Sequence, residues 1–571
     1  MWHFCARTVL PLLLSVSHGA VLAQDTTGTV TPCDGRIVSE IVITPLDPSF
    51  LAVPRGLRPL ARGVGLHHTT SKADVIRRFV LLEVGDPCTE RQRAETERIL
   101  RIQPFLADAA VRAVADTRGG VRIEVQTIDE IPTVFGMRLR GMRPSALRFG
   151  NGNVGGRGLY LAANVERGFA YRTGVKVEGT AYQAFGRPYT LAFVAERAPL
   201  GSTLSLALGH PFFTDLQRTA WHAGFRDVNR YLSFVSPDGD PHSLKVQRRF
   251  WDLGGVRRVG LGRNSGFVGV LLTEEAMTPA NRFVIVSDTG LAADTTGVLD
   301  EPVPSYRNLR LNAIVGVRTL SFKAVRGFDA LTAVQDVATG VQFGTLVGRG
   351  FPRSGTHDDD RLVVAELYAG RGSATAFAGL RVEGEARFDP HTDRWDSMVG
   401  SGRLALYIKP AESHVLVGSA EFGGGQQLRV PFQLRLGDLQ GGVRGYAASR
   451  RAGSARTVLR LEERWTIGRL TRHGTFGLSS FADAGSVRAG DAPFGIDSGI
   501  KVGVGVGLLA AFPPQSQRLW RVDLAVPVSA DPHARWEVRL TSATTRTFGQ
   551  EPDDVVRGRA GAAPSTIFGW P

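Results

Sequence analysis

The sequence predicts a small α+β domain followed by a transmembrane antiparallel β-barrel of about 16 strands. Three observations carry this prediction. An export-type segment begins the chain, helical spacing of apolar residues stops near Thr133, and alternating apolar and polar residues then continue to Phe548. At 571 residues the chain exceeds one average domain, and a small domain with a large barrel accounts for that length.

The first residues have the pattern of a secretory signal peptide. Arg7 precedes an apolar stretch, and the small residues Val21 and Ala23 follow it. We therefore expect residues 1–23 to be removed. Cys5 lies within the removed segment, which disfavours a lipid-anchored N-terminus. No later run reaches about 18 apolar residues, so no membrane-spanning helix is expected.

Two cysteines, Cys33 and Cys88, remain in the mature chain. An oxidising compartment favours a disulfide between them, although the sequence does not fix the distance between their backbones. The formal net charge of +14 fits either an anionic partner, such as lipid phosphates, or arginines that fill a polar lumen.

Residues 24–132 are predicted to form the small domain. A first strand and a first helix each present one apolar face. The members of these faces are Ile37, Ile41 and Ile43 in the strand, and Val75, Ile76, Phe79 and Leu82 in the helix. A second helix begins at Thr89, where Gln92 completes a capping box.

Two further strands, residues 109–115 and 121–127, flank the turn DTRGG, whose glycines permit a tight hairpin. The predicted order is β-α-α-β-β. In this order, and in the stretch GDPCTERQRAETERILRIQPFLADAAVRAV, the domain resembles a POTRA domain, the periplasmic polypeptide-binding module of outer-membrane assembly and secretion proteins. The resemblance implies binding of extended segments by strand addition to a sheet edge. A generic α+β adaptor without peptide binding is the alternative.

Residues 133–548 are predicted to form the barrel, because apolar and charged residues alternate along them. In LRVEGEARF, Leu380, Val382, Ala386 and Phe388 face one way, and Arg381, Glu383, Glu385 and Arg387 face the other. LRLNAIVGVR, residues 309–318, repeats the pattern. A membrane-spanning structure made of strands satisfies its backbone only as a closed barrel, and about 16 strands of about ten residues fill the range. A soluble β-sandwich or propeller is the alternative.

The last predicted strand lies in RWEVRLTSATTRTF and ends at Phe548. A closing strand that ends in an aromatic residue resembles the C-terminal signal of bacterial outer-membrane barrels. The chain departs from that pattern by continuing, and its Gly- and Pro-containing tail, residues 549–571, is predicted to be disordered.

No motif predicts catalysis, a cofactor or a metal site, so an enzyme is not expected. Gly150, Gly152 and Gly155 fit G-x-G-x-x-G, but a predicted strand follows where a dinucleotide site needs a helix. The acidic stretch 357–360 is expected to be a solvated loop rather than a calcium site. The adjacent histidines 67–68 have a spacing that rarely places both on one metal.

A set of short motifs occurs in order along the chain. ALRFGNGNVGGRGLYL begins the barrel, VRGY, LEERW and FADAG follow, and RVDLAVPV and WEVRLT end it. In this set the chain resembles the BamA-like superfamily of outer-membrane assembly factors and translocators, with its bacterial surface antigen type C-terminal barrel. The resemblance implies a loop lock inside the barrel, formed by Val443, Arg444, Gly445, Tyr446, Glu462, Arg464, Phe481, Asp483 and Gly485.

The implied lock has a physical basis in the alternation. The side chains expected to face the lumen are Arg460, Glu462, Arg464, Phe481 and Asp483. If the loop folds inward, the planar guanidinium of Arg444 meets the carboxylate of Asp483, Glu462 or both with paired donors, which lysine does not offer. The flanking glycines let the backbone pass close to the wall. A surface arginine in a turn is the alternative.

The resemblance implies a bacterial outer-membrane protein, with its POTRA domain in the periplasm, that assists insertion or translocation of polypeptides. Implied partners are unfolded outer-membrane or secreted polypeptides, membrane lipid and lipopolysaccharide, whereas neither nucleic acid nor a cofactor is implied. Relatives usually have more than one POTRA domain, and one is predicted here, so a two-partner-type translocator for a specific exported client stays open. A passive porin or a surface-exposed structural barrel is the alternative from another class.

Overall fold

The computed structural model describes most of the chain. The described residues are 29–48, 70–117, 119–140, 143–167, 173–198, 200–239, 241–260, 264–287, 290–295, 303–351, 358–437, 441–471 and 473–544. The predicted signal peptide (1–23), the histidines 67–68 and the predicted tail (549–571) lie outside them.

The N-terminal domain has the predicted β-α-α-β-β order. Its elements are β1 (Val38–Leu46), α2 (Ala73–Arg77), α3 (Glu90–Arg101), β2 (Leu106–Ala115) and β3 (Val121–Asp129). The sheet order is β1-β3-β2, with β1 parallel and β2 antiparallel to β3. The strand β3 is therefore central, and β1 and β2 are the two edges.

The two helices cover this sheet and enclose a core that includes Phe79, Leu100 and Ile123. Cys33 and Cys88 are joined by a disulfide within that core, and neither is exposed. The disulfide ties the segment before β1 to the segment before α3.

The start of α3 is the predicted one, since the Thr89 side chain accepts a hydrogen bond from the Gln92 N–H at 3.2 Å. Two local expectations differ. The helix α2 ends at Arg77 rather than continuing, because the chain turns toward α3, where the Leu81 N–H donates to Thr96 Oγ1 at 3.1 Å. Ile37 is 52% exposed and does not share the core face, because the pairing register shifts at the start of β1.

The larger sheet is a closed antiparallel barrel. Among the described residues its ring has nine strands from β4 to β12, six from β14 to β19 and five from β22 to β26, twenty in all, with the short β13 paired to β12. The bounds are β4 Thr133–Arg140, β5 Arg143–Asn151, β6 Leu159–Arg167, β7 Thr173–Ala184, β8 Tyr189–Ala198, β9 Gly201–His210, β10 Thr219–Val235, β11 Pro241–Val259, β12 Asn264–Val286, β13 Leu291–Ala293, β14 Tyr306–Arg326, β15 Val334–Gly350, β16 Arg361–Gly372, β17 Ala376–Asp389, β18 Arg394–Ala411, β19 His414–Gln426, β22 Ala455–Thr471, β23 Gly474–Arg488, β24 Lys501–Ala511, β25 Arg518–Pro527 and β26 Glu537–Thr544.

The expected number of strands, about 16, is lower than this count. The difference arises in the first part of the barrel, where β4 to β9 are short strands of 8 to 12 residues joined by short connections. The expectation shared about 16 strands over residues 133–548, with modest loops and turns between them.

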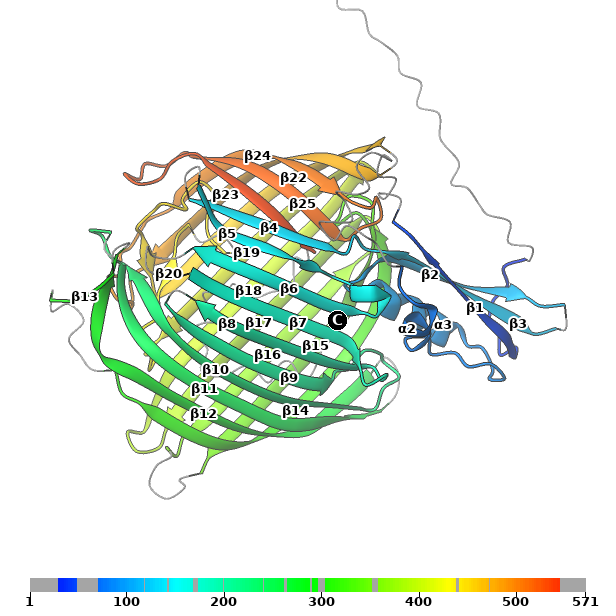
Figure 1. Cartoon of the computed structure of the whole chain (residues 1–571), viewed down its shortest axis with the longest axis horizontal. Coiled ribbons are helices and arrows are strands. Elements are labelled where there is room, and N and C mark those ends of the chain that lie inside the picture. Colours follow the sequence, from blue (N-terminus) through cyan, green and yellow to red (C-terminus); the bar gives the residue numbers. More distant parts are fainter. Residues whose placement is uncertain are drawn as a thin grey trace, which may run out of the picture.

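The N-terminal domain lies against one end of the barrel, here called the near end (Figure 1). The strand β4 starts four residues after β3 ends, so the barrel begins at this end. Because neighbouring strands are antiparallel, the connections alternate between the two ends. The connection from β19 to β22 therefore lies at the opposite end, the far end, where Figure 1 shows β20 (Leu434–Arg435).

The barrel wall has its apolar face outside and its polar face inside. Outward side chains such as Val315, Leu461 and Leu508 are 52%, 61% and 61% exposed. Inward Arg310 and Arg387 are 2% and 0% exposed. The alternation predicted for residues 309–318 and 380–388 is observed. An apolar outer face of this extent is typical of barrels in a lipid environment. Within the described part of the chain, none of the helices combines the length and apolar character needed to span a bilayer.

The helix α3 packs against the near end through buried polar contacts. The carboxylate of Glu95 accepts from both Arg98 (2.8 and 2.9 Å) and the Asp215 N–H (2.8 Å). Arg98 also donates to the Phe213 carbonyl at 2.9 Å. Arg101 meets Asp336, the third residue of β15, at 2.7 and 3.0 Å. These contacts fix the domain on the barrel.

The turn between β14 and β15, residues 327–333, folds into the near end. The ring of Phe328 stacks on Tyr407 of β18, with centroids 5.1 Å apart. Leu331 packs against Leu509 of β24 and Leu519 of β25. Since β24 and β25 are far from β14 in the ring order, this turn crosses the near opening.

We predict that the Glu95→Gln variant loosens the domain from the barrel. Burial acts to raise the pKa of the Glu95 carboxyl, but Arg98 and the Asp215 N–H outweigh it, and the pKa lies below its ordinary value. A carboxyl with a lowered pKa stabilises the folded contact at every pH above its ordinary pKa. This stabilisation is lost as the pH falls through the lowered pKa. At neutral pH, the contact between the domain and the barrel should be about 2 kcal/mol less stable in the variant than in wild type. Acid should loosen this contact less in the variant than in wild type, as measured by hydrogen exchange over residues 90–101. Equal exchange in both proteins at neutral pH would contradict this.

Candidate functional site

The connection from β19 to β22 crosses the far opening of the barrel. Its described residues, 427–437 and 441–454, are called the crossing loop. The Gln433 side chain exchanges hydrogen bonds with the backbone of Val235 at the β10–β11 turn, at 2.8 and 2.9 Å. Arg450 donates to the Pro237 carbonyl of the same turn at 2.9 Å. Since β12 and β14 to β18 separate β19 from β11 in the ring, the loop reaches across the lumen.

Arg444 anchors the crossing loop to the wall. Its guanidinium contacts Asp483 of β23 through two parallel bonds, Nε to Oδ2 at 2.8 Å and Nη2 to Oδ1 at 2.7 Å. The Arg444 backbone N–H adds a third bond to Oδ2 at 3.2 Å. The guanidinium carbon lies 3.4 Å from the ring centroid of Phe481, a cation–π contact. Asp483 is fully buried and Arg444 is 7% exposed, so this pair is removed from water.

A buried charge is stable only when it is paired, and here the pairing extends over six side chains. Arg444 Nη1 also lies 3.3 Å from Glu462 and 3.4 Å from Asp523. Arg521 binds Glu462 at 2.7 and 2.9 Å and Asp523 at 2.7 Å. Arg464 binds Glu462 at 2.6 Å. These three arginines and three carboxylates, called the Arg444 cluster, carry no net formal charge.

The other predicted lock residues hold the loop backbone. Gly445 has φ +90°, a backbone conformation that residues other than glycine rarely adopt, and its N–H donates to Glu537 at 2.9 Å. The Tyr446 hydroxyl lies 2.8 Å from the Ser529 carbonyl and accepts from the Ser529 N–H at 3.1 Å. Val443 packs in a small buried cluster with Tyr446. A Cβ at Gly485 would approach the Val443 side chain to 2.6 Å.

Arg460, expected to face the lumen, also reaches the loop and donates to the Gly442 carbonyl at 3.0 Å. All nine predicted lock residues therefore belong to one region of the molecule. Arg464 binds Glu462 and also connects this region to the near-end turn, because its Nη1 donates to the Phe328 carbonyl at 3.1 Å.

Inward-facing glycines on β24 allow the crossing loop to approach the wall closely. The sequence did not lead us to expect them. Gly503, Gly505 and Gly507 face inward along KVGVGVG. A Cβ at these positions would lie 2.1 Å from the Arg444 carbonyl, 2.3 Å from the Phe481 ring and 2.2 Å from Asp523, respectively. Three glycines at every second position of a strand were the available signal.

Arg521 and Asp523 were also missed. They lie in RVDLAVPV, which was recognised only as a strand. Their spacing repeats the E-x-R arrangement of Glu462 and Arg464, with two opposite charges on the inward face, and that spacing was the available signal.

A second buried cluster anchors the other end of the crossing loop. Arg310 binds Asp360 at 2.6 and 2.7 Å, and Arg387 binds Glu275 at 2.7 Å. Arg429 of the loop lies 3.8 Å from Asp360 and 2.9 Å from Asp396. The expectation of a solvated acidic loop is wrong for Asp360, which is 1% exposed, because inward arginines surround it. His357 lies outside the described residues.

Of the glycines of the G-x-G-x-x-G match, Gly150 lies in β5, and Gly152 and Gly155 lie in the turn from β5 to β6, which contacts the N-terminal domain. The strand β6 follows, as expected, and the Gly156 carbonyl accepts from the Lys72 N–H at 2.9 Å. Among the described residues, no group of three or more His, Cys, Asp or Glu side chains is placed to hold a metal ion.

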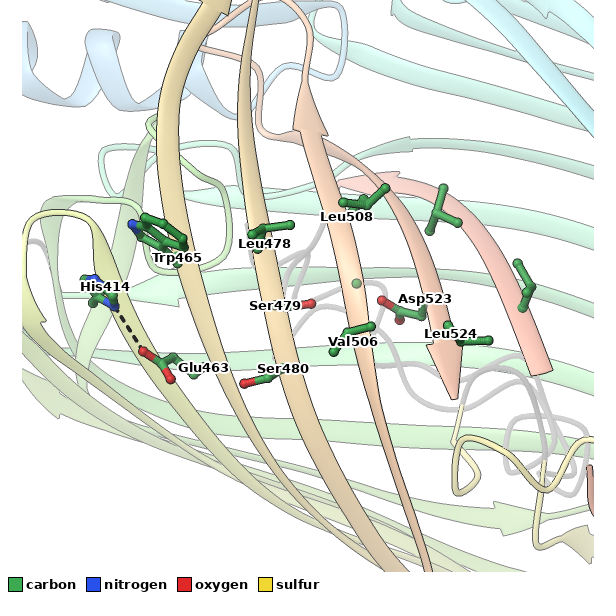
Figure 2. Close-up of a pocket in the computed structure, with 13 residues that line it drawn as sticks. His414, Glu463, Trp465, Leu478, Ser479, Ser480, Val506, Leu508, Asp523 and Leu524 are labelled. Atoms are coloured by element: carbon green, nitrogen blue, oxygen red, sulfur yellow. Dashed lines mark hydrogen bonds and ion pairs between the residues drawn. The ribbon is translucent and has the colours of Figure 1, made fainter. Parts of the chain in front are cut away.

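The outer wall beside the Arg444 cluster has a groove of about 520 Å³. Figure 2 shows His414 paired with Glu463 at its edge, at 3.0 Å, beside Trp465. Its further lining is mostly apolar, with Leu478, Val506, Leu508 and Leu524. This composition suits contact with lipid, and His414 and Glu463 are partners of each other within the wall.

We predict that Arg444→Ala lowers the stability of the folded barrel by about 3–5 kcal/mol, because Asp483 is left buried without its partner. Heat-modifiability on gels and the melting temperature measure this loss. Arg450→Ala is the matched control in the same loop, since Arg450 donates its hydrogen bond to the Pro237 carbonyl in an exposed setting. An equal effect of the two variants would contradict the prediction. Exchanging Arg444 and Asp483 for each other should restore part of the loss.

We predict that Gly503→Ala displaces the crossing loop, because the added methyl meets the Arg444 carbonyl. Overpacking of this kind costs about 1–3 kcal/mol, and trypsin cleavage of the loop should become faster. Gly418→Ala on β19 is the matched control, since a Cβ there meets nothing within 4 Å. Unchanged cleavage in Gly503→Ala would show that the inward-facing glycines do not hold the loop.

Comparison with known proteins gives similarities in structure. No protein-family model matches the chain, and no curated protein matches it. The chain is similar to BamA from Haemophilus ducreyi lacking POTRA domains 1–3 (TM-score 0.38, 11% identity, 89% of this chain and 85% of that chain). It is similar to CdiB from Acinetobacter baumannii (TM-score 0.36, 11% identity, 89% of this chain and 73% of that chain). It is also similar to CdiB from Escherichia coli (TM-score 0.38, 12% identity, 91% of this chain and 92% of that chain). At this degree of similarity none of the three assigns a family or a role to this chain.

Proposed function

We propose that this chain is a bacterial outer-membrane protein that assists the insertion or translocation of other polypeptides, with its N-terminal domain in the periplasm acting as a POTRA domain. The observation that carries the proposal is the crossing loop, held across the far opening by Arg444 at the VRGY motif and by Asp483 at the F-x-D-x-G motif. The apolar outer face of the wall supports the membrane location.

Segments at both ends of the lumen favour this role over that of a passive porin. A porin needs a water-filled path, whereas the crossing loop spans the far opening and the turn 327–333 with α3 spans the near one. Buried ion pairs hold the crossing loop and α3, so either segment moves away from the wall only when these pairs break. A barrel with such internal segments is suited to a gated task.

The proposed mechanism is not enzymatic. The N-terminal domain binds an extended segment of an unfolded client through main-chain hydrogen bonds at a sheet edge. Its rigid seat on the near end then presents the client to the barrel. By resemblance to the BamA-like superfamily, the seam between β26 and β4 is the place where the client meets the wall. Membrane lipid and lipopolysaccharide are the further partners.

A dedicated translocator for one exported client is the second candidate. The observation that favours it is the three-stranded sheet β1-β3-β2, which is the α+β sheet found in the described part of the chain and offers two edges rather than an array of them. The two roles differ in how many kinds of client the domain holds.

We predict that a photo-crosslinking residue at Arg112, exposed on β2, captures unfolded polypeptides in cells. A crosslinker at Asp74, exposed on α2, is the matched control and should capture far fewer. Mass spectrometry of the products identifies the clients, with many barrel proteins indicating general assembly and one exported protein a dedicated translocator. Capture of lipid and lipopolysaccharide alone, at both positions, would exclude polypeptide handling.

A further inference from the structure

The edge strand β2 of the N-terminal domain is occupied by the protein itself. An edge strand presents a row of N–H and C=O groups to any extended chain. Here the Thr31 N–H donates to the Ala113 carbonyl at 3.0 Å, and the Ala115 N–H donates to the Thr29 carbonyl at 3.1 Å. Val30 and Val114 face each other as an antiparallel bridge. Residues 29–31 therefore form a short additional strand beside β2.

A covalent tether holds this short strand in place. Pro32 follows it and favours an extended conformation at Thr31. Cys33 comes next and is bound to Cys88 in the buried core. Bonds from Arg36 N–H to the Cys33 carbonyl and from Cys88 N–H to the Arg36 carbonyl, at 2.9 and 2.8 Å, fix the turn that follows. The tether keeps residues 29–31 at a high effective concentration beside β2.

The short strand itself adds little packing to the domain. Val30, its central residue, is 68% exposed, so its attachment to β2 depends on two main-chain hydrogen bonds. Another extended segment offers the same bonds. Exchange of one strand for another at this edge conserves the hydrogen bonds and leaves the core unchanged.

The helix α3 occupies the next position of the same edge. The Val111 N–H donates to the Glu97 carboxylate at 3.1 Å, and Arg93 donates to the Val111 carbonyl. Side chains satisfy these groups, and Arg93 and Glu97 also pair with each other at 3.0 Å. Arg93 and Glu97 therefore remain paired with each other when the backbone of a bound segment replaces them on Val111.

We propose that residues 29–31 are a built-in occupant of the β2 edge, and that an extended polypeptide segment binds this edge by displacing them. The inference rests on the proposed function, and it adds that the edge is not vacant at rest. A segment longer than three residues is favoured, because it pairs with Val111 as well as with Ala113 and Ala115. Short or poorly extended segments do not displace the tethered strand.

Two proline substitutions test whether the hydrogen bond from residues 29–31 to β2 keeps a peptide off this edge. Thr31→Pro removes the N–H that donates to Ala113. Val30→Pro removes an N–H that points away from β2, since the bonds of this bridge are made by Thr29 and Thr31, and it is the matched control. A variant that lacks residues 29–31 gives a second open edge in case Thr31→Pro folds poorly.

The experiment uses the full chain in lipid nanodiscs and a labelled synthetic peptide with the sequence of residues 535–548, RWEVRLTSATTRTF, with a scrambled peptide for comparison. We expect the peptide to bind Thr31→Pro about tenfold more tightly than wild type, the effect of roughly one hydrogen bond. Val30→Pro should match wild type. Hydrogen exchange at the Ala115 amide should be faster in Thr31→Pro and should slow again when the peptide binds.

Two results would overturn the inference, and they are distinguishable. Equal peptide affinity in all variants, with faster exchange at Ala115 in Thr31→Pro, would show that the occupant does not compete, and would leave the proposed function standing. No binding to any variant, with the same faster exchange, would show an open edge that takes no client, and would overturn the proposed function as well.

Discussion

The bidentate contact between Arg444 and Asp483 is the interaction on which the far end of this barrel depends. Asp483 is fully buried, and a buried carboxylate without a cation is strongly destabilising. Both of its oxygens accept from the crossing loop, so the loop leaves the wall only if this charge is left unpaired or hydrated. The inward glycines of β24 let the loop backbone approach closely enough for the contact to form.

One carboxylate connects the two ends of the molecule. Glu462 contacts Arg444 of the crossing loop and also Arg464, which donates to the Phe328 carbonyl of the near-end turn. Asp336, just after that turn, pairs with Arg101 of α3. A contiguous series of polar contacts and one short turn thus runs from the far opening to the N-terminal domain. A shift of the crossing loop has a physical route to the N-terminal domain, and the reverse is equally true.

The sequence predicts those features that depend on local periodicity. Alternation along β14 and β17 assigns the faces of Arg310 and Arg387 correctly, and the ordered motifs bring Arg444 to Asp483. Features that depend on register between distant strands were not predictable. Asp523 and Arg521 join the cluster only because β25 lies beside β24 and β24 beside β23, and Asp360 is buried because two inward arginines from other strands meet it. The glycines of β24 carry no side chain whose chemistry predicts a contact. The short connections between β4 and β9 place more strands in this part of the chain than the expected total of about 16 allows.

The central claim is that Arg444 holds the crossing loop across the lumen. The most direct measurement is the distance between spin labels at Ala448 of the loop and Asp238 of the β10–β11 turn, both exposed, in lipid nanodiscs. Cys33 and Cys88 are joined to each other and do not react with the spin labels. We expect a short, narrow distance distribution in wild type that becomes broader and longer in Asp483→Asn. A broad distribution in wild type, or a narrow one that Asp483→Asn leaves unchanged, would contradict the claim.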